Sequence, residues 1–124
     1  MTDKSPWSRI VGPCYTVVGM ARQLRWTEEE VINAGNTCRL LMLSTSDHVL
    51  LFPAFQLNNG EVVQGLSEVL RILATGTRGR WTWAQWLNGE LPGKNPPRNI
   101  DALRAGNLDA VMRDARHDAE AWSS

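Results

Sequence analysis

Residues 27–36, with the sequence TEEEVINAGN, establish the architecture of the N-terminal half of the chain. Thr27 and Glu30 have the spacing of a capping box, in which the two residues satisfy each other's free backbone N–H groups at a helix start. The apolar residues that follow are expected to face inward, and Gly35 with Asn36 is typical of a helix end. The stretch therefore predicts a short capped helix from residue 28 to about residue 36.

The segments on either side of this helix complete a recognisable order of elements. Apolar residues recur at helical spacing over residues 14–24, which predicts a preceding helix separated from the capped one by a short turn. Beyond it, the apolar runs 39–44 and 49–52 are separated by turn-forming residues 45–48, which indicates a β-hairpin. Helix, turn, capped helix and hairpin is the order of a helix-turn-helix unit with a wing.

The rest of the chain is predicted to be helical. We expect a flexible N-terminus at residues 1–13, the winged helix-turn-helix-like unit at 14–57 and a helical module at 58–122. The fold class is accordingly α+β, mainly α. Amphipathic patterns and turn residues place helices in the second module at 62–75, 83–87 (with Thr82 as N-cap), 100–105 and 108–122.

Composition narrows the functional classes. The 124-residue chain carries 13 basic and 13 acidic residues and is 43% hydrophobic, values that suit one ordinary globular protein. The N-terminus lacks the apolar core of a signal peptide, and no apolar run is long enough to span a bilayer. Cys14 and Cys38 are too few for a disulfide framework, so we expect reduced thiols in a cytoplasmic protein.

Catalysis and metal binding have little support in the sequence. His48 and His117 are far apart and neither lies in a nucleophile motif, and the glycines near residue 76 lack the lysine and strand context of a phosphate loop. We therefore expect no enzyme activity, no cofactor and no metal site. The clustered residues Trp81, Trp83 and Trp86 have two interpretations, core anchors or a protein-interaction hot spot.

DNA binding remains open on the residues alone. In a helix-turn-helix the second helix enters the major groove, and here its first turn carries three glutamates that phosphates would repel. Polar and basic residues around it could nevertheless contact DNA, so the unit is either a DNA reader or a scaffold reused for packing or dimerisation. The candidate DNA-binding residues are Arg22, Arg25, Asn33, Asn36, Thr37 and Arg39.

An ordered set of residues resembles the Xre/MbcA/ParS toxin-binding family over residues 14–122. The set runs through Leu51-Phe52-Pro53-Ala54-Phe55-Gln56, Val69-Leu70, Trp83, Trp86-Leu87, Leu91, Gly93, Pro97, Leu103, Gly106 and Val111. Members of this family are antitoxins of type II toxin–antitoxin modules. The resemblance implies a partner with a RES domain, an NAD-consuming toxin, whose active site the C-terminal half of the antitoxin occludes.

The resemblance also implies a set of toxin-binding positions and an oligomeric assembly. Dimers or hetero-oligomers are common in the family, and some members repress their own operon. We therefore predict an antitoxin that neutralises a RES-domain toxin; the alternative is a small DNA-binding transcriptional regulator without a toxin partner. The implied toxin-binding residues are Trp86, Leu91, Gly93, Pro97, Leu103, Gly106, Val111, Met112, Arg116 and Trp122.

Overall fold

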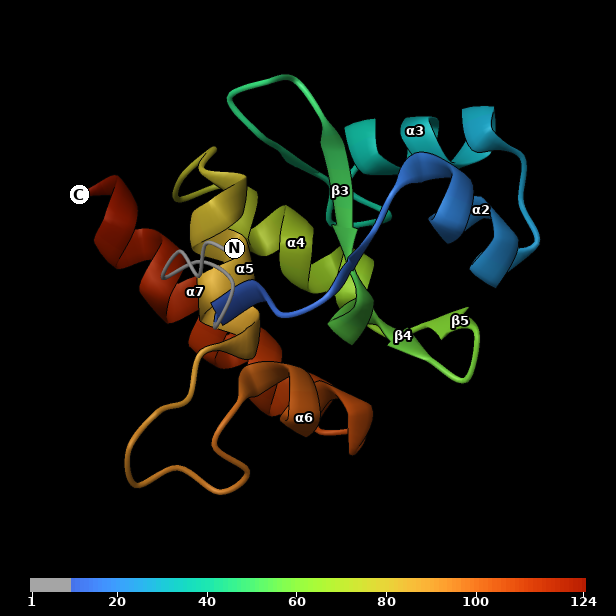
Figure 1. Ribbon diagram of the computed structural model, residues 1–124. Coiled ribbons are helices and arrows are strands. Elements are labelled where there is room, and N and C mark those ends of the chain that lie inside the picture. Colours follow the sequence, from blue (N-terminus) through green and yellow to red (C-terminus); the bar gives the residue numbers. More distant parts are fainter. Residues whose placement is uncertain (1–9) are drawn as a thin grey trace, which may run out of the picture.

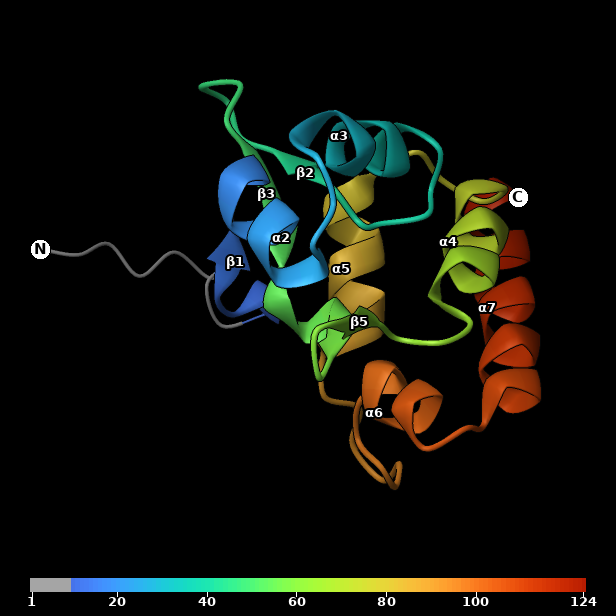
Figure 2. The same cartoon turned by 90° about the vertical axis from the view of Figure 1, so that its right-hand side faces the viewer.

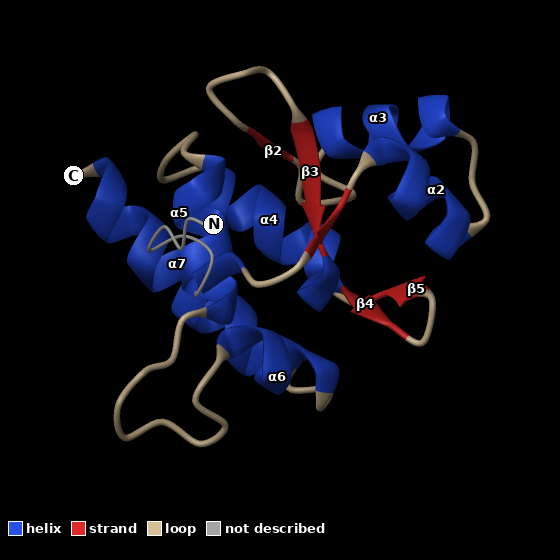
Figure 3. Ribbon diagram, viewed as in Figure 1, coloured by secondary structure: helices blue, strands red, loops and turns tan. Residues whose placement is uncertain are grey.

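The computed structural model describes residues 10–124 and is an α+β structure in which helices predominate (Figure 1, Figure 3). Two helices, a small three-stranded sheet and a two-stranded hairpin form the N-terminal part, and helices form the rest, as the predicted fold class requires. The expected flexible segment 1–13 lies mostly outside the described residues, but Val11 is only 4% exposed and packs in the core. None of the described helices is long and apolar enough to cross a membrane.

The predicted helix-turn-helix is present. Helix α2 spans Val17–Leu24 and ends at Arg25, whose positive φ of 62° turns the chain toward α3, Glu28–Asn36. Both bonds of the capping box form: the backbone N–H of Glu30 donates to Thr27 Oγ1 at 3.0 Å, and that of Thr27 donates to Glu30 Oε1 at 2.9 Å. Because these bonds lie within one turn, the sequence alone was enough to predict where α3 begins.

A three-stranded antiparallel sheet, with strand order β1-β3-β2, lies beside these helices (Figure 3). Strands β2, Leu43–Ser44, and β3, Leu50–Pro53, form the predicted hairpin. Strand β1, Cys14–Tyr15, was expected to be helical; α2 starts later because Thr16 Oγ1 caps it, accepting from the N–H of Gly19. The register pairs Cys14 with Pro53, Tyr15 with Phe52, Leu43 with Leu51 and Ser44 with Leu50.

A buried glutamine shortens the first strand of the hairpin relative to the predicted run 39–44. Gln56 is fully buried, and its side chain accepts from the backbone N–H of Leu41 at 2.8 Å and donates to the carbonyl of Leu41 at 2.9 Å. The amide group thus bonds Leu41 as a neighbouring strand would. Gln56 ends the 3₁₀ turn η1, Ala54–Gln56, which leads into the small hairpin of β4, Leu57–Asn58, and β5, Glu61–Val62.

Four helices make up the C-terminal part; one of them starts one residue earlier than predicted, at Asn99, and two start further from the predicted residues. The first begins at Leu66 and not at Val62, because Val62 belongs to β5 and Gly65 turns the chain with a φ of 90°. The tryptophan-rich helix begins at Arg80, so Thr82 lies inside its first turn and is not the N-cap. The helices are α4 (Leu66–Ala74), α5 (Arg80–Asn88), α6 (Asn99–Arg104) and α7 (Leu108–Ser123).

The two predicted units share a core, so the expected boundary between residues 57 and 58 is not a break in packing. Leu41 and Leu43 from the N-terminal unit belong to the same buried cluster as Leu87 of α5 and Leu70 of α4. In Figure 2, α5 lies between the sheet and the pair formed by α4 and α7. A second, smaller cluster fills the space between α2, α3 and the sheet: Met20, Ala21, Val31, Ala34, Leu40, Met42 and Phe52.

A polar contact joins the same two units. The guanidinium of Arg80, at the start of α5, donates from Nη1 to the carbonyl of Gly35 at 2.8 Å and to that of Met42 at 3.3 Å. Its carbon Cζ also lies 5.6 Å from the ring centroid of Trp83. Arg80 therefore connects the end of α3 and the residue before β2 to the C-terminal helices.

Candidate functional site

The candidate DNA-binding residues all lie on the surface of the helix-turn-helix. Arg22 is on the last turn of α2, and Arg25 is in the turn that follows it. Asn33 and Asn36 are on α3, on the side that does not pack into the core. All six candidates are exposed: Arg22, Arg25, Asn33, Asn36, Thr37 and Arg39.

Three of these residues are connected at the C-terminal end of α3. The hydroxyl of Thr37 donates to the backbone carbonyl of Asn33 at 2.9 Å, and Nε of Arg39 donates to Thr37 Oγ1 at 3.3 Å. The bond holds the Arg39 side chain against the helix end and leaves its two terminal amino groups for another acceptor. A guanidinium held in this way presents its remaining donors in a fixed plane, which suits a phosphate oxygen.

The three carboxylates in the first turn of α3 differ in how they are held. The bond from the backbone N–H of Thr27, the contact with the Thr27 side chain and the positive charge of Arg39 lower the pKa of Glu30. Glu30 is thus committed to the capping box, whereas Glu28 and Glu29 are exposed and make no ion pair within the described chain. The lowered pKa keeps Glu30 charged as well, so this end of the helix is acidic, with Glu28 and Glu29 free to move.

The structure does not gather the implied toxin-binding residues on one surface. Leu103 is 3% exposed and Val111 is 2% exposed, because α6 and α7 bury them in the large core. Their side chains cannot contact a partner without unfolding, which corrects the expectation for these two positions. Met112 also packs against this core, and the exposed members of the set are Leu91, Gly93, Pro97, Gly106 and Arg116.

Two glycines of that set have a conformational role. Gly93 has a φ of 78° and Gly106 a φ of 90°, in the left-handed region that glycine adopts without steric cost. A Cβ at either position would meet no atom within 4 Å, so backbone conformation and not crowding favours glycine there. Gly106 makes the turn between α6 and α7, and Gly93 lies in the loop before α6.

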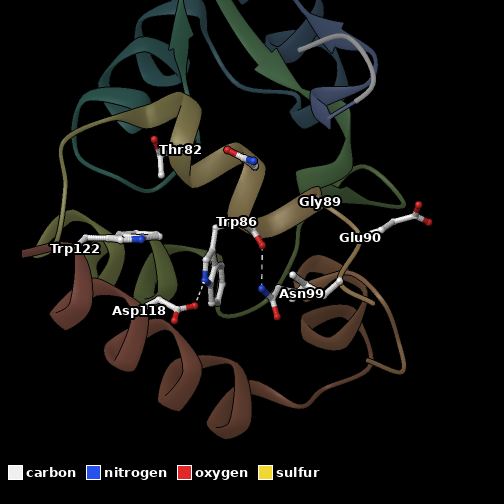
Figure 4. A pocket seen from close by; sticks show the side chains of 9 residues that line it. Thr82, Trp86, Gly89, Glu90, Asn99, Asp118 and Trp122 are labelled. Atoms are coloured by element: carbon white, nitrogen blue, oxygen red, sulfur yellow. Dashed lines mark hydrogen bonds between the residues drawn. The ribbon is translucent and has the colours of Figure 1, made fainter. Parts of the chain in front are cut away.

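The remaining two members, Trp86 and Trp122, line a pocket of about 430 Å³ together with Leu91 (Figure 4). Trp86 projects from α5 and Trp122 from the end of α7. The indole Nε1 of Trp86 donates to Asp118 Oδ2 at 2.7 Å, and the backbone carbonyl of Trp86 accepts from Nδ2 of Asn99 at 2.9 Å. Three of the implied toxin-binding residues therefore meet in one concave site.

The sequence pattern missed two polar residues of this pocket. Asp118 was not among the residues predicted for the site, yet it is half-buried and bonded to Trp86. Asn99 is 2% exposed, and its Oδ1 accepts from Nζ of Lys94. The spacing of Asp118 and Trp122, one helical turn, could have indicated that they share a face, but nothing local indicates the bond to Trp86, which lies 32 residues away.

Two of the three tryptophans of α5 make contacts inside the protein. Trp83 is 4% exposed, and its Nε1 donates to the carbonyl of Thr77 at 3.0 Å. Trp81 donates from Nε1 to the carbonyl of Ser44 at 3.2 Å, across to the first strand of the hairpin. These two residues are core and inter-unit contacts, and Trp86 faces the pocket.

The fold defines the chain as a helix-turn-helix with a β-hairpin and a helical C-terminal module sharing one core. No known protein family matches the sequence, and no curated protein matches it. Among solved structures, the chain is similar to the NMR structure of Rv2175c, with a TM-score of 0.68 and 22% identity. The similarity covers 96% of this chain and 99% of that one, so the two proteins share their fold over essentially their whole length.

Proposed function

We propose that the protein binds DNA through its winged helix-turn-helix as a small transcriptional regulator. In this proposal α3 lies in the major groove, where Asn33 and Asn36 contact base edges. Arg22, Arg25 and Arg39 bind phosphates on either side of the groove. The observation that carries the proposal is the exposure of all six candidate residues on adjacent elements, without a role in the core.

In this proposal the hairpin of β2 and β3 acts as the wing. Strands β2 and β3 follow α3 directly, and the hairpin lies beside that helix (Figure 1, Figure 3). Its tip, residues 45–49, is largely exposed, with His48 in the left-handed region at a φ of 64°. A protruding turn next to the recognition helix can contact the phosphate backbone beside the groove that the helix occupies.

Salt dependence and base selectivity test this proposal together. With three arginine–phosphate contacts per subunit, the logarithm of the affinity should fall with a slope of about −2.7 against the logarithm of salt concentration. Fluorescence anisotropy on the upstream DNA of the gene and on a scrambled duplex measures both properties. Equal affinity for the two duplexes, or no binding at low salt, would contradict the proposal.

Variants on α3 make the test specific to that helix. Replacing Asn33 and Asn36 by alanine should lower the preference for the upstream DNA, whereas the control Asn107→Ala, before α7, should leave it unchanged. Replacing Glu28 and Glu29 by glutamine should strengthen binding to both duplexes, because two exposed carboxylates would no longer face phosphates. If these glutamine variants bind DNA as the unchanged protein does, α3 does not face the duplex.

A second function, that of an antitoxin for a RES-domain, NAD-consuming toxin, is supported by a different observation. The resemblance to the toxin-binding family implies Trp86, Leu91 and Trp122 as contacts, and these three line the pocket between α5 and α7. The exposed loop around Gly93 and the outer side of α7 at Arg116 adjoin it in sequence. Docking there would need an interface of on the order of 1,000 Å².

Co-production with the product of the neighbouring gene tests the antitoxin proposal. A stable complex on size-exclusion chromatography, together with relief of growth arrest, is the expected result. Replacing Trp122 by alanine should weaken the complex, and replacing the exposed Arg71 of α4 by alanine should not. Growth arrest that persists with the unchanged protein, without a complex, would reject this function and leave the DNA-binding proposal standing.

A further inference from the structure

The pocket between α5 and α7 combines two indole rings with a carboxylate. In Figure 4, Trp122 lies to one side of Trp86, and the carboxylate of Asp118 lies at the indole nitrogen of Trp86. Both tryptophans are half-buried, so part of each ring remains accessible. An aromatic face carries partial negative charge, and a carboxylate beside it adds a full one.

The basic side chains near this pocket pair with carboxylates other than that of Asp118. Glu90 points away from the indoles in Figure 4 and pairs with Nη2 of Arg98 at 3.6 Å. Lys94 pairs with Asp114 at 3.6 Å, one helical turn before Asp118. Within the described residues Asp118 makes no ion pair, and its one hydrogen bond comes from a neutral indole. Lys94 also donates to Asn99, which lines the pocket, but the two charged residues in the lining itself are Asp118 and Glu90, and both are negative.

We propose that this pocket binds a small organic cation, with Trp86 and Trp122 contacting its alkyl or planar surface and Asp118 supplying the opposite charge. A volume of about 430 Å³ is within the range of small-molecule sites. Asp118 would repel an anion, and a neutral apolar ligand would desolvate the carboxylate without compensation. The proposal rests on neither DNA nor toxin binding.

A pair of isosteric probes isolates the charge of the ligand. Choline and 3,3-dimethylbutan-1-ol have nearly the same shape, but only choline carries a positive charge. Titration of the full chain, followed by NMR of the indole N–H signals, should shift the signals of Trp86 and Trp122 with choline at concentrations at least about fivefold lower than with the alcohol. Equal titration by the two probes would overturn the proposal.

Matched variants locate the site. Asp118→Asn keeps an oxygen that can accept from Trp86 but removes the charge, and it should weaken choline binding about fivefold or more. Glu120→Gln makes the same charge change on the exposed side of α7 and should have no such effect.

A third variant tests the aromatic contribution. Trp122→Leu keeps an apolar side chain without an aromatic face, and it should also weaken binding while thermal melting shows that the protein remains folded. If Asp118→Asn or a folded Trp122→Leu binds choline as the unchanged protein does, the cation does not bind between these groups and the proposal fails. Loss of binding in both, with Glu120→Gln unaffected, supports it.

Discussion

Gln56 shows how one side chain can complete a sheet. It is the last residue of η1 and is fully buried, and it makes three hydrogen bonds, two to Leu41 and one to the carbonyl of Pro53 at 3.1 Å. A buried backbone group without a partner destabilises a protein by about 1–3 kcal/mol. Gln56 therefore supplies the hydrogen-bond partners that a neighbouring strand would otherwise give Leu41.

Replacing Gln56 by leucine should lower the free energy of unfolding by about 3 kcal/mol, because the backbone groups of Leu41 lose their partner in the core. Urea denaturation followed by circular dichroism measures this change. Gln64→Leu, at an exposed position, is the matched control and should change stability by no more than about 0.5 kcal/mol. Similar losses in both variants would show that Gln56 has no special role.

Glu30 makes the stability of α3 depend on pH. Its pKa in the folded protein lies below the ordinary value of 4.5, chiefly because of the hydrogen bond from the backbone N–H of Thr27. The charged form is the one stabilised, so its contribution is fully present above pH 4.5 and disappears as the pH falls through the lowered pKa. Acid should therefore weaken the start of α3.

The variant Glu30→Gln tests this pH dependence. Comparing its urea denaturation with that of the unchanged protein should give a difference that is constant near neutral pH and shrinks below pH 4.5. Glu29→Gln, one residue earlier and outside the capping box, is the control. A difference for Glu30→Gln that does not vary with pH would contradict the lowered pKa.

Helix packing depends on a small residue where α4 ends. Gly76 lies after α4, and a Cβ there would be 2.4 Å from the backbone oxygen of Ala119 on α7 and 2.5 Å from its Cα. These are backbone atoms, so relief would require moving the helix itself. The close approach of α4 and α7, side by side in Figure 2, thus requires glycine at this position.

Gly76→Ala should destabilise the protein by about 1–3 kcal/mol, because the added methyl group pushes α7 away from α4. Gly19→Ala is the matched control, since a Cβ inside α2 would make only ordinary contacts, the nearest at 3.4 Å to Tyr15. Alanine at Gly19 should be neutral or raise stability by up to about 1 kcal/mol through its higher helix propensity. Thermal melting of the two variants in opposite directions is the expected result.

The whole molecule is organised around the core that joins its two halves. Val11, Leu41 and Leu43 are buried against the C-terminal helices, and Arg80 bonds to the end of α3. Neither half can therefore lose its structure without exposing apolar surface of the other. The proposed DNA-binding surface therefore lies on one of these two joined halves and the C-terminal pocket on the other.

The two halves should accordingly unfold in a single transition. Far-ultraviolet circular dichroism and tryptophan fluorescence should give the same urea midpoint, because four of the six tryptophans lie in or after α5 whereas α2 and α3 contribute to the dichroism. As a second measurement, a fragment of residues 1–57 should lack the cooperative melting of the full chain. Two separate midpoints would show that the shared core does not couple the halves.

Local patterns were sufficient for elements whose bonds lie within a few residues. The capping box of Thr27 and Glu30 fixed the start of α3, and the apolar spacing from residue 108 onward indicated α7 nearly to its end. The hairpin followed from two apolar runs around a turn. In each case the interacting groups are close in the chain, so a short segment of the sequence contains both partners at the spacing that the contact requires.

Long-range packing settled the rest. The bond between Trp86 and Asp118 joins residues 32 positions apart, and that between Gln56 and Leu41 joins residues 15 apart. The apolar spacing around Leu103 and Val111 can occur in a helix that binds a partner as well as in one that packs in a core. It is the packing of α6 and α7 that buries these two side chains. Periodicity orients one element, whereas burial, shared cores and pockets depend on which surfaces the folded chain brings into contact.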